Sequence, residues 1–260
     1  MNLGIEGRKA LVCGASKGLG RACAEALAAE GVDVTITGRT ADVLAATVKD
    51  MQARFPDVKV VGIAGDITTK EGRKAALAAC PAPDILINNA GGPPLGDWRK
   101  FTEEEWLAAT NNNMVSGIML IRDVIDGMAE RRFGRIINIT SIVVKMPFDA
   151  LSLSVTSRLG LTGFSKSIAA KYIGANVTLN NILPEQFETD RLKSNLDKLA
   201  DRAGRSFEDE LRVQKSTSPA KRFGRVEEFG AVCAFYCSAH VGYMTGQNVL
   251  IDGGRYPGVF

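Results

Sequence analysis

The sequence predicts an α/β fold in which helices cover both faces of a parallel sheet. Short apolar runs alternate with helix-like runs along the whole chain, without a linker, a low-complexity block or a repeat. This alternation is typical of right-handed βαβ units. The apolar runs at 10–13, 85–87 and 136–139 hardly alternate with polar residues, as expected for strands that are buried on both faces.

Length and composition restrict the kind of protein. The 260 residues suit one large α/β domain, and we expect a single domain over 1–260. The net charge of +3 is too small to favour a nucleic-acid or membrane partner. Residues 1–9 lack the apolar segment of a signal peptide, and no apolar run has the length of a membrane span. We therefore expect a cytoplasmic protein.

The cysteines and the histidine argue against a metal site. The five cysteines form no Cys-x-x-Cys pair, and Cys233 and Cys237 lie one helical turn apart in an apolar run that is typical of core packing. His240 is the only histidine, so we expect neither a zinc site nor a Ser-His-Asp triad.

Seven strands and the helices between them follow from the pattern of apolar residues. Strands are predicted at 10–13, 32–37, 58–63, 84–88, 135–139, 177–183 and 247–251. Helices are predicted to begin at 21 and after Asp42, which we expect to be the N-cap of its helix. Another helix is predicted at 73–79, after a turn and cap at 65–68, and Thr102 with Glu105 forms a capping box that begins a further helix. The remaining helices are predicted at 111–132, 154–173 and 226–239. The charged segment 189–217, which Gly204 interrupts, is predicted to form a mobile lid over the substrate.

The glycine-rich stretch after the first strand predicts a dinucleotide site. Its spacing, Gly14-x-x-x-Gly18-x-Gly20, is a variant of the dinucleotide fingerprint, and a helix follows it directly. Glycines allow a sharp turn and a close approach to a phosphate, and the N–H groups of a helix N-terminus favour negative charge. We expect the whole loop to contact the cofactor, which adds Ser16, Lys17 and Leu19 to the three glycines.

Basic residues at two positions favour NADP(H) over NAD(H). An NAD site usually has an acidic residue about 20 residues after the glycines, at the end of the second strand. This chain has Arg39 there and no acid before Asp42. The guanidinium of Arg39 suits a 2′-phosphate, and Lys17 could reach the same group. The alternative is that both cations are simply solvated.

The ordered motifs of this chain resemble those of the short-chain dehydrogenase/reductase family, particularly its bacterial 3-oxoacyl-carrier-protein-reductase-like members. The resemblance covers nearly the whole chain. It is carried by the glycine loop, Asp66-Ile67, Asn88-Asn89-Ala90-Gly91, Asn113, Ile139-Thr140-Ser141, the run 160–167, Glu188-Thr189-Asp190, Thr245-Gly246-Gln247 and Asp252-Gly253-Gly254.

The resemblance implies a fold, an activity and a set of roles. It implies a Rossmann-type, doubly wound parallel sheet of about seven strands in a three-layer αβα arrangement, and a homo-oligomer, commonly a tetramer or else a dimer. The activity would be NADP(H)-dependent hydride transfer to or from a ketone, an aldehyde or a 3-oxoacyl thioester. The implied contacts are Asp66 and Ile67 with the adenine, Asn88, Ala90, Gly91 and Thr189 with the rest of the cofactor, Asn113 with a relay water, and Ser141 with the substrate carbonyl.

The chain departs from the family at the proton-donating pair. Family members usually carry Tyr-x-x-x-Lys thirteen residues after the serine, where this chain has Ser154-x-x-x-Arg158. A serine hydroxyl is a far weaker acid than a phenol, and an arginine stays protonated but can stabilise an oxyanion. Arg158 could also bind the cofactor ribose, as the family lysine does.

Three hypotheses follow from this departure. In the first, Ser141 and Ser154 bind the carbonyl, Arg158 supplies positive charge, and water, a cofactor hydroxyl or Lys145 supplies the proton. In the second, the protein binds NADP(H) as a weakly active or inactive sensor or assembly partner. In the third, Tyr256 reaches the site of a neighbouring subunit.

Three more residues have open roles. Glu185 stands where members of the resembled family commonly have a glycine. Its side chain either points to solvent or turns inward toward Arg158 or the nicotinamide. Lys145 and Arg191 could hold an acidic group of the substrate or lie in solvent. The sequence does not choose among the substrate classes.

Overall fold

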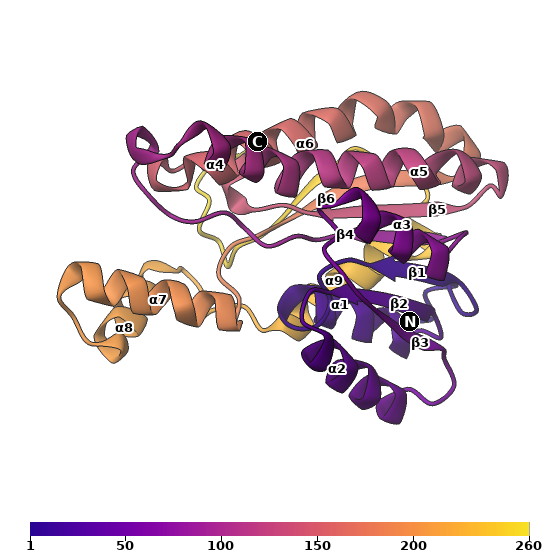
Figure 1. Cartoon of the computed structure of the whole chain (residues 1–260), viewed down its shortest axis with the longest axis horizontal. Helices are drawn as coiled ribbons and strands as arrows, with labels where there is room; N and C mark the ends of the chain where they lie inside the picture. The colour runs from indigo at the N-terminus through magenta and orange to yellow at the C-terminus, as the bar shows by residue number, and fades with distance from the viewer. Residues whose placement is uncertain (260) are drawn as a thin grey trace.

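The structure is a computed structural model, which describes residues 1–259, and its centre is a parallel sheet of seven strands (Figure 1). The strand order is β3-β2-β1-β4-β5-β6-β7, so the chain reverses its direction of winding between β1 and β4. This confirms the predicted fold class. The strands are β1 Lys9–Val12, β2 Asp33–Gly38, β3 Val60–Ala64, β4 Ile85–Asn88, β5 Gly134–Ile139, β6 Val177–Pro184 and β7 Asn248–Ile251.

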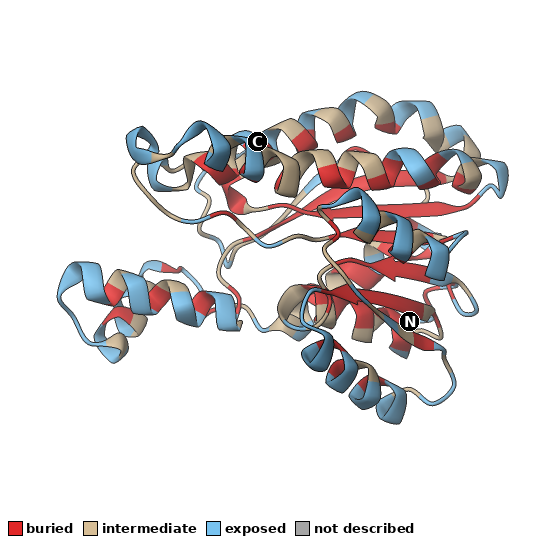
Figure 2. Cartoon of the chain, in the orientation of Figure 1, coloured by how far each residue is buried: buried red, intermediate tan, exposed pale blue. Residues whose placement is uncertain are grey.

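Helices cover both faces of the sheet and bury it (Figure 2). On one face, α1 Gly18–Ala29, α2 Ala41–Arg54 and α9 Val226–Cys237 pack around a core that contains Leu27, Met51 and Phe229. On the other face, α3 Lys70–Ala79, α5 Ser116–Glu130 and α6 Ser152–Tyr172 enclose a second core that contains Leu120 and Met128. Removing these apolar side chains from water on both faces stabilises the sheet. Within residues 1–259, no helix combines the length and the apolar character that a membrane crossing requires.

Two helices project from this three-layer body (Figure 1). They are α7 Asp190–Ala203 and α8 Phe207–Thr217, and they pack on each other through a small apolar cluster that contains Leu192, Leu196 and Phe223. Gly204 ends α7 with a φ of +60°, a left-handed conformation that glycine adopts without strain.

The segment predicted as a helix over 111–132 is helical, but its first turn is not α-helical and it ends at Glu130. A separate helix, α4 Glu103–Thr110, precedes it, with the predicted capping box at Thr102 and Glu105. Residues Asn111–Val115 then form a π-helical turn, and α5 ends at Glu130. The wider turn is held by tertiary contacts, since the Asn111 amide donates to the carbonyl of Thr68, and apolar periodicity does not reveal such contacts.

Two predicted helix caps are also wrong. Thr40, not Asp42, stands at the N-cap of α2, and Asp42 lies inside the first turn. Thr69, not the 65–68 turn, caps α3 and accepts a hydrogen bond from the Gly72 N–H. Asp66 instead accepts hydrogen bonds from the N–H and hydroxyl of Thr68, so its side chain closes the turn that precedes the cap.

A ladder of asparagines crosses four strands at one register. Asn88, Asn138, Asn181 and Asn248 face one another on β4, β5, β6 and β7. Each amide bonds the next at 2.9 Å, and Asn138 also donates to the Ser165 hydroxyl on α6. Because a buried amide is costly without partners, the ladder fixes the register of these strands.

We predict that Asn138→Ala destabilises the fold by ~3 kcal/mol, because it leaves the buried amides of Asn88 and Asn181 without this partner. Urea denaturation followed by circular dichroism measures the change. Asn248→Ala, at the exposed end of the same ladder, is the matched control and should cost about 1 kcal/mol, since water reaches that end. Equal losses in the two variants would show that the ladder does not carry this stability.

Candidate active site

The candidate site lies where β1 and β4 end, at the point where the strand order reverses. In open α/β sheets, ligands bind outside the carboxyl ends of the strands at such a switch point. The Asn89 amide, which directly follows β4, donates to the carbonyl of Gly14 at 3.0 Å. The Gly14 N–H donates to the Thr37 hydroxyl of β2 at 3.1 Å. The start of the glycine loop is therefore tied to both neighbouring strands.

The predicted glycines are required by this geometry. Gly14 and Gly18 have φ values of +55° and +62°, which other residues adopt only with strain. A Cβ atom on Gly20 would lie 2.4 Å from the Gly14 carbonyl oxygen. Ser16 is held in the loop by its carbonyl, which accepts the Thr47 hydroxyl, and Leu19 packs against the core. The predicted loop residues are therefore brought together as expected.

The N-terminus of α1 is open to a ligand. Lys17 stands at the N-cap position, and its side chain does not cap the first turn. The first N–H groups of a helix have no partner within the helix, and a phosphate can accept them. The glycine loop thus forms a cradle that fits the diphosphate of a dinucleotide.

Arg39 and Asp66 stand beside this cradle, after β2 and β3. The Arg39 side chain is exposed, and a Cβ atom on Gly91 would lie 4.0 Å from its Nη2 atom, so it leans toward the loop after β4. Burial raises the pKa of the Asp66 carboxyl, but hydrogen bonds from Thr68 and the charge of Arg39 outweigh burial and leave that pKa below its usual value. The Asp66 carboxyl is therefore charged at neutral pH.

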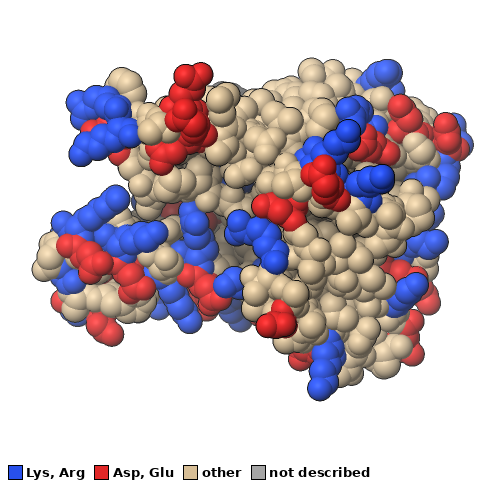
Figure 3. Space-filling model, viewed as in Figure 1, with Lys and Arg blue, Asp and Glu red and all other residues tan. Residues whose placement is uncertain are grey.

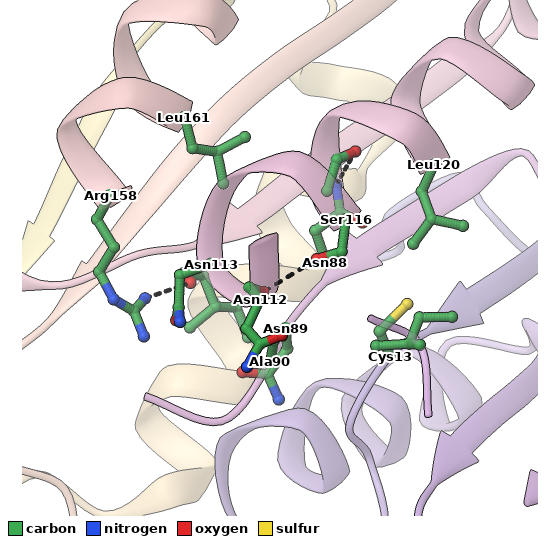
Figure 4. Close-up of a pocket in the computed structure, with 13 residues that line it drawn as sticks. Cys13, Asn88, Asn89, Ala90, Asn112, Asn113, Ser116, Leu120, Arg158 and Leu161 are labelled. Atoms are coloured by element: carbon green, nitrogen blue, oxygen red, sulfur yellow. Dashed lines mark hydrogen bonds between the residues drawn. The ribbon is translucent and has the colours of Figure 1, made fainter. Parts of the chain in front are cut away.

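A pocket with both polar and apolar lining residues lies between the strand ends and the helices α5 and α6 (Figure 4). Five predicted site residues line it: Ile67, Asn88, Ala90, Asn113 and Arg158. Asn113 is buried in the π-helical turn, and its amide donates to the Ala109 carbonyl. The Oδ1 atom of Asn88 is buried and accepts no hydrogen bond from residues 1–259.

Ser154 and Arg158 form one hydrogen-bonded unit. The Arg158 Nε atom donates to the Ser154 hydroxyl at 3.0 Å, and its Nη1 atom donates to the carbonyls of Ile139 and Thr140 at the end of β5. Burial, and then the nearby charge of Arg191, lowers the pKa of Arg158 to about 10. The guanidinium therefore remains a partly buried cation at neutral pH. Ser141 follows the same strand end, and its hydroxyl accepts the Val143 N–H at 3.3 Å.

The first turn of α7 touches the site at two places. Thr189 caps this helix and lies against Gly18, where an added Cβ would be 3.5 Å from the threonine methyl. Asp190 pairs with Lys17 at 3.2 Å, although both side chains are largely exposed. Arg191 donates through Nη2 to the carbonyls of Gly92 and Pro93. Lys17, predicted to reach a 2′-phosphate, is thus engaged with α7.

Two residues with open roles have contacts within the chain that the sequence did not indicate. Glu185 points neither to solvent nor to Arg158, because it pairs with Arg255 at 3.0 Å, and burial raises the pKa of its carboxyl. Tyr256 lies near Lys145 of its own chain, whose Nζ atom is 5.6 Å from the centre of the phenol ring. The C-terminal segment is therefore packed against the ends of β5 and β6 within one subunit.

Residues 8–200 match the profile of the short chain dehydrogenase family. The chain belongs to this family. The 3-oxoacyl-[acyl-carrier-protein] reductase FabG of Vibrio harveyi is 32% identical over 258 residues, which cover 98% of this chain and 99% of that protein. The NADPH-dependent reductase BacG of Bacillus subtilis is 30% identical over 251 residues, with 95% and 97% covered.

A solved structure shares the whole fold of this short-chain dehydrogenase. The L-sorbose reductase from Gluconobacter frateurii, in complex with NADPH and L-sorbose, matches with a TM-score of 0.94 and 28% identity over 100% of both chains. The chain is thus an oxidoreductase of this family. NADPH is the nucleotide bound to that reductase and required by BacG, in agreement with the prediction of NADP(H).

Sequence reasoning missed how the short-chain dehydrogenase site is held together. Asn89 was part of a recognised motif, but its bond to Gly14 depends on the pairing of β1 with β4. Gly92 belongs to none of the recognised motifs, yet a Cβ atom there would lie 3.7 Å from the Nη2 atom of Arg158 and 3.7 Å from that of Arg191. No local pattern signals either contact, because each joins segments that are distant in sequence.

We predict that Gly20→Ala lowers both stability and NADPH affinity, since the new methyl group meets backbone that can give way only by distorting the loop. Fluorescence titration with NADPH should show at least about a tenfold loss of affinity, equal to ~1.4 kcal/mol. Gly163→Ala on α6 is the control, because no atom lies within 4 Å of the added Cβ and alanine favours the helix. Unchanged NADPH affinity in Gly20→Ala would contradict the cradle.

Proposed function

We propose that this chain catalyses NADP(H)-dependent hydride transfer between the cofactor and a carbonyl or alcohol substrate. One observation carries the proposal: the open cradle at α1 lies at the same sheet edge as the partly buried Ser154–Arg158 pair. The glycine loop and the start of α1 can hold a dinucleotide, and the Ser154–Arg158 pair can polarise a carbonyl. The cofactor is NADP(H), as the NADPH-dependent relatives support.

The cofactor residues follow the order of the strand ends. The glycine loop with Ser16 and Leu19 would hold the diphosphate, and Arg39 would bind the 2′-phosphate, while Lys17, which was also predicted to reach that phosphate, stays paired with Asp190. Asp66 and Ile67 would hold the adenine. Asn88, Ala90, Gly91 and Thr189 would contact the remaining half, and Arg158 could also bind its ribose.

Carbonyl reduction requires a hydride, which NADPH supplies when bound, and a proton for the new oxyanion. The hydroxyls of Ser141 and Ser154 would bind the carbonyl oxygen. Arg158 would then stabilise the developing negative charge, because its guanidinium stays positive below a pKa of about 10 and is partly shielded from water. Asn113 would position a relay water in the pocket that it lines.

The proton has a second candidate source besides water. Lys145 and Tyr256 both carry acidic protons and stand together after the end of β5. Their contact favours a donor that is contributed in cis by the C-terminal segment over one from a neighbouring subunit.

The remaining parts of the proposal concern organisation. We treat 1–260 as a single NADP-binding domain in which 189–217 acts as the substrate lid. This segment contains α7 and α8, which project from the body, and the first turn of α7 contacts both the glycine loop and the loop after β4. We also propose a homo-oligomer, a dimer or a tetramer, which multi-angle light scattering can measure.

We predict that the wild-type protein binds NADPH at least about tenfold more tightly than NADH, and that Arg39→Ala narrows this gap by removing a cation from the 2′-phosphate. Fluorescence titration with both nucleotides measures the gap. Arg8→Ala, which removes a half-exposed arginine that pairs with Asp84 at the opposite end of the sheet, is the control. Equal affinities in the wild type would overturn the 2′-phosphate assignment.

We predict that Arg158→Ala lowers kcat by at least about a hundredfold, or ~2.7 kcal/mol, because the oxyanion loses its partly buried charge. Steady-state assays with NADPH and a panel of ketones and aldehydes measure it. Tyr256→Phe should lower kcat by about tenfold or more if the phenol supplies the proton, and Lys145→Met tests the ammonium in the same way. Tight NADPH binding without turnover of any substrate would contradict the proposed activity.

A further inference from the structure

Two arginines face each other across Gly92 without an acidic partner. A Cβ atom on Gly92 would lie 3.7 Å from Nη2 of Arg158 on α6 and 3.7 Å from Nη2 of Arg191 on α7. The two atoms are therefore at most twice that distance apart. Neither arginine takes part in an ion pair within residues 1–259, since both donate to backbone carbonyls and Arg158 also donates to a serine hydroxyl.

Two acids of the segment from the end of β6 to the start of α7 pair with other cations. Asp190, next to Arg191, pairs with Lys17 across the cleft, and Glu185 pairs with Arg255. The two guanidiniums therefore place unbalanced positive charge at the entrance to the site. An anion bound between the two guanidiniums would relieve the repulsion between their positive charges. Burial, and then the charge of Arg191, lowers the pKa of Arg158, which is consistent with this repulsion. Figure 3 shows Lys and Arg side chains along the hollow between the projecting α7–α8 pair and the body.

The donors of Arg158 indicate how an anion would sit. Nε and Nη2 share one edge of the planar guanidinium. Nε holds the Ser154 hydroxyl, and Nη2 faces Gly92 without a hydrogen bond to residues 1–259. The Ser154 hydroxyl, which would bind the carbonyl, and the Nη2 atom, which faces Arg191, therefore lie at the two ends of one edge of the Arg158 guanidinium. A ligand that uses both must carry its anion within a few atoms of its carbonyl.

We propose that Arg158 and Arg191 select a substrate that carries a carboxylate close to its carbonyl, such as a short oxo acid. This inference rests on the proposed function, because it names the substrate class of the same site. Arg191 acts as the specificity residue. It lies on α7 in the lid, and closure of the lid would bring its guanidinium to the substrate carboxylate while Arg158 binds the carbonyl end of the substrate. The anion could instead be a phosphate of the cofactor, and the experiment separates the two sources.

The test compares acids with their neutral esters. Pyruvate, acetoacetate and levulinate are each assayed against the corresponding methyl ester with NADPH. We expect at least one acid to be turned over with a kcat/KM at least about tenfold above that of its ester. We expect Arg191→Gln to reduce this acid-to-ester ratio by about tenfold or more. Arg202→Gln removes the same charge from the exposed far end of α7 and should leave the ratio unchanged.

A binding measurement keeps this test independent of turnover. The melting temperature of the NADP⁺-loaded protein is recorded with each acid and ester, and we expect it to rise with an acid, to rise less with its ester, and to lose this difference in Arg191→Gln. Arg191→Lys, which keeps the charge but not the fork, should fall between the wild type and Arg191→Gln.

The outcomes separate the two proposals. Esters that match or exceed their acids, in the assay and in the melting temperatures, overturn the carboxylate site while the proposed activity stands. Acid binding that depends on Arg191 without turnover supports the site and overturns the activity. A loss of NADPH affinity in Arg191→Gln with an unchanged acid-to-ester ratio assigns the arginine to a cofactor phosphate and overturns the inference.

Discussion

The contact between the Asn89 amide and the Gly14 carbonyl holds the functional edge of this protein together. It bridges the two strands that wind in opposite directions from the centre of the sheet, and it leaves no room for a side chain at Gly20. Because α1 must then begin directly above the bridge, its unpaired N–H groups face the crevice between β1 and β4. The nucleotide cradle is thus a consequence of how the sheet reverses.

The same edge carries a second constraint, which is a partly buried cation. Arg158 stands at the ends of β5 and α6, where backbone carbonyls and the Ser154 hydroxyl replace part of its hydration. Carbonyls satisfy the hydrogen-bonding capacity of a guanidinium but do not neutralise its charge. Such a site is suited to a developing oxyanion or to a carboxylate, and it differs in kind from a phenol, which gives up a proton. The chain thus keeps the glycine loop that the family pattern predicts, and it has Ser154 and Arg158 where that pattern has a tyrosine and a lysine. We propose that this pair serves the carbonyl.

Much of this could be predicted from the sequence. The seven strands followed from apolar runs, and the glycine loop and Arg39 followed from spacing, because these features are local. The π-helical turn at Asn111–Val115, the pairing of Lys17 with Asp190 and that of Glu185 with Arg255 could not be predicted, since each depends on a partner from another part of the fold. The asparagines of the ladder were visible in the sequence, but only strand register aligns them.

The most direct measurement is a crystal structure of the chain with bound NADP⁺. The account predicts the hydroxyls of Ser141 and Ser154 and the guanidinium of Arg158 within hydrogen-bonding distance of one point above the reactive carbon of the nicotinamide, with Arg39 on the 2′-phosphate. A nicotinamide surrounded by apolar side chains, with Arg158 still turned to the carbonyls of Ile139 and Thr140 and away from that point, would contradict it.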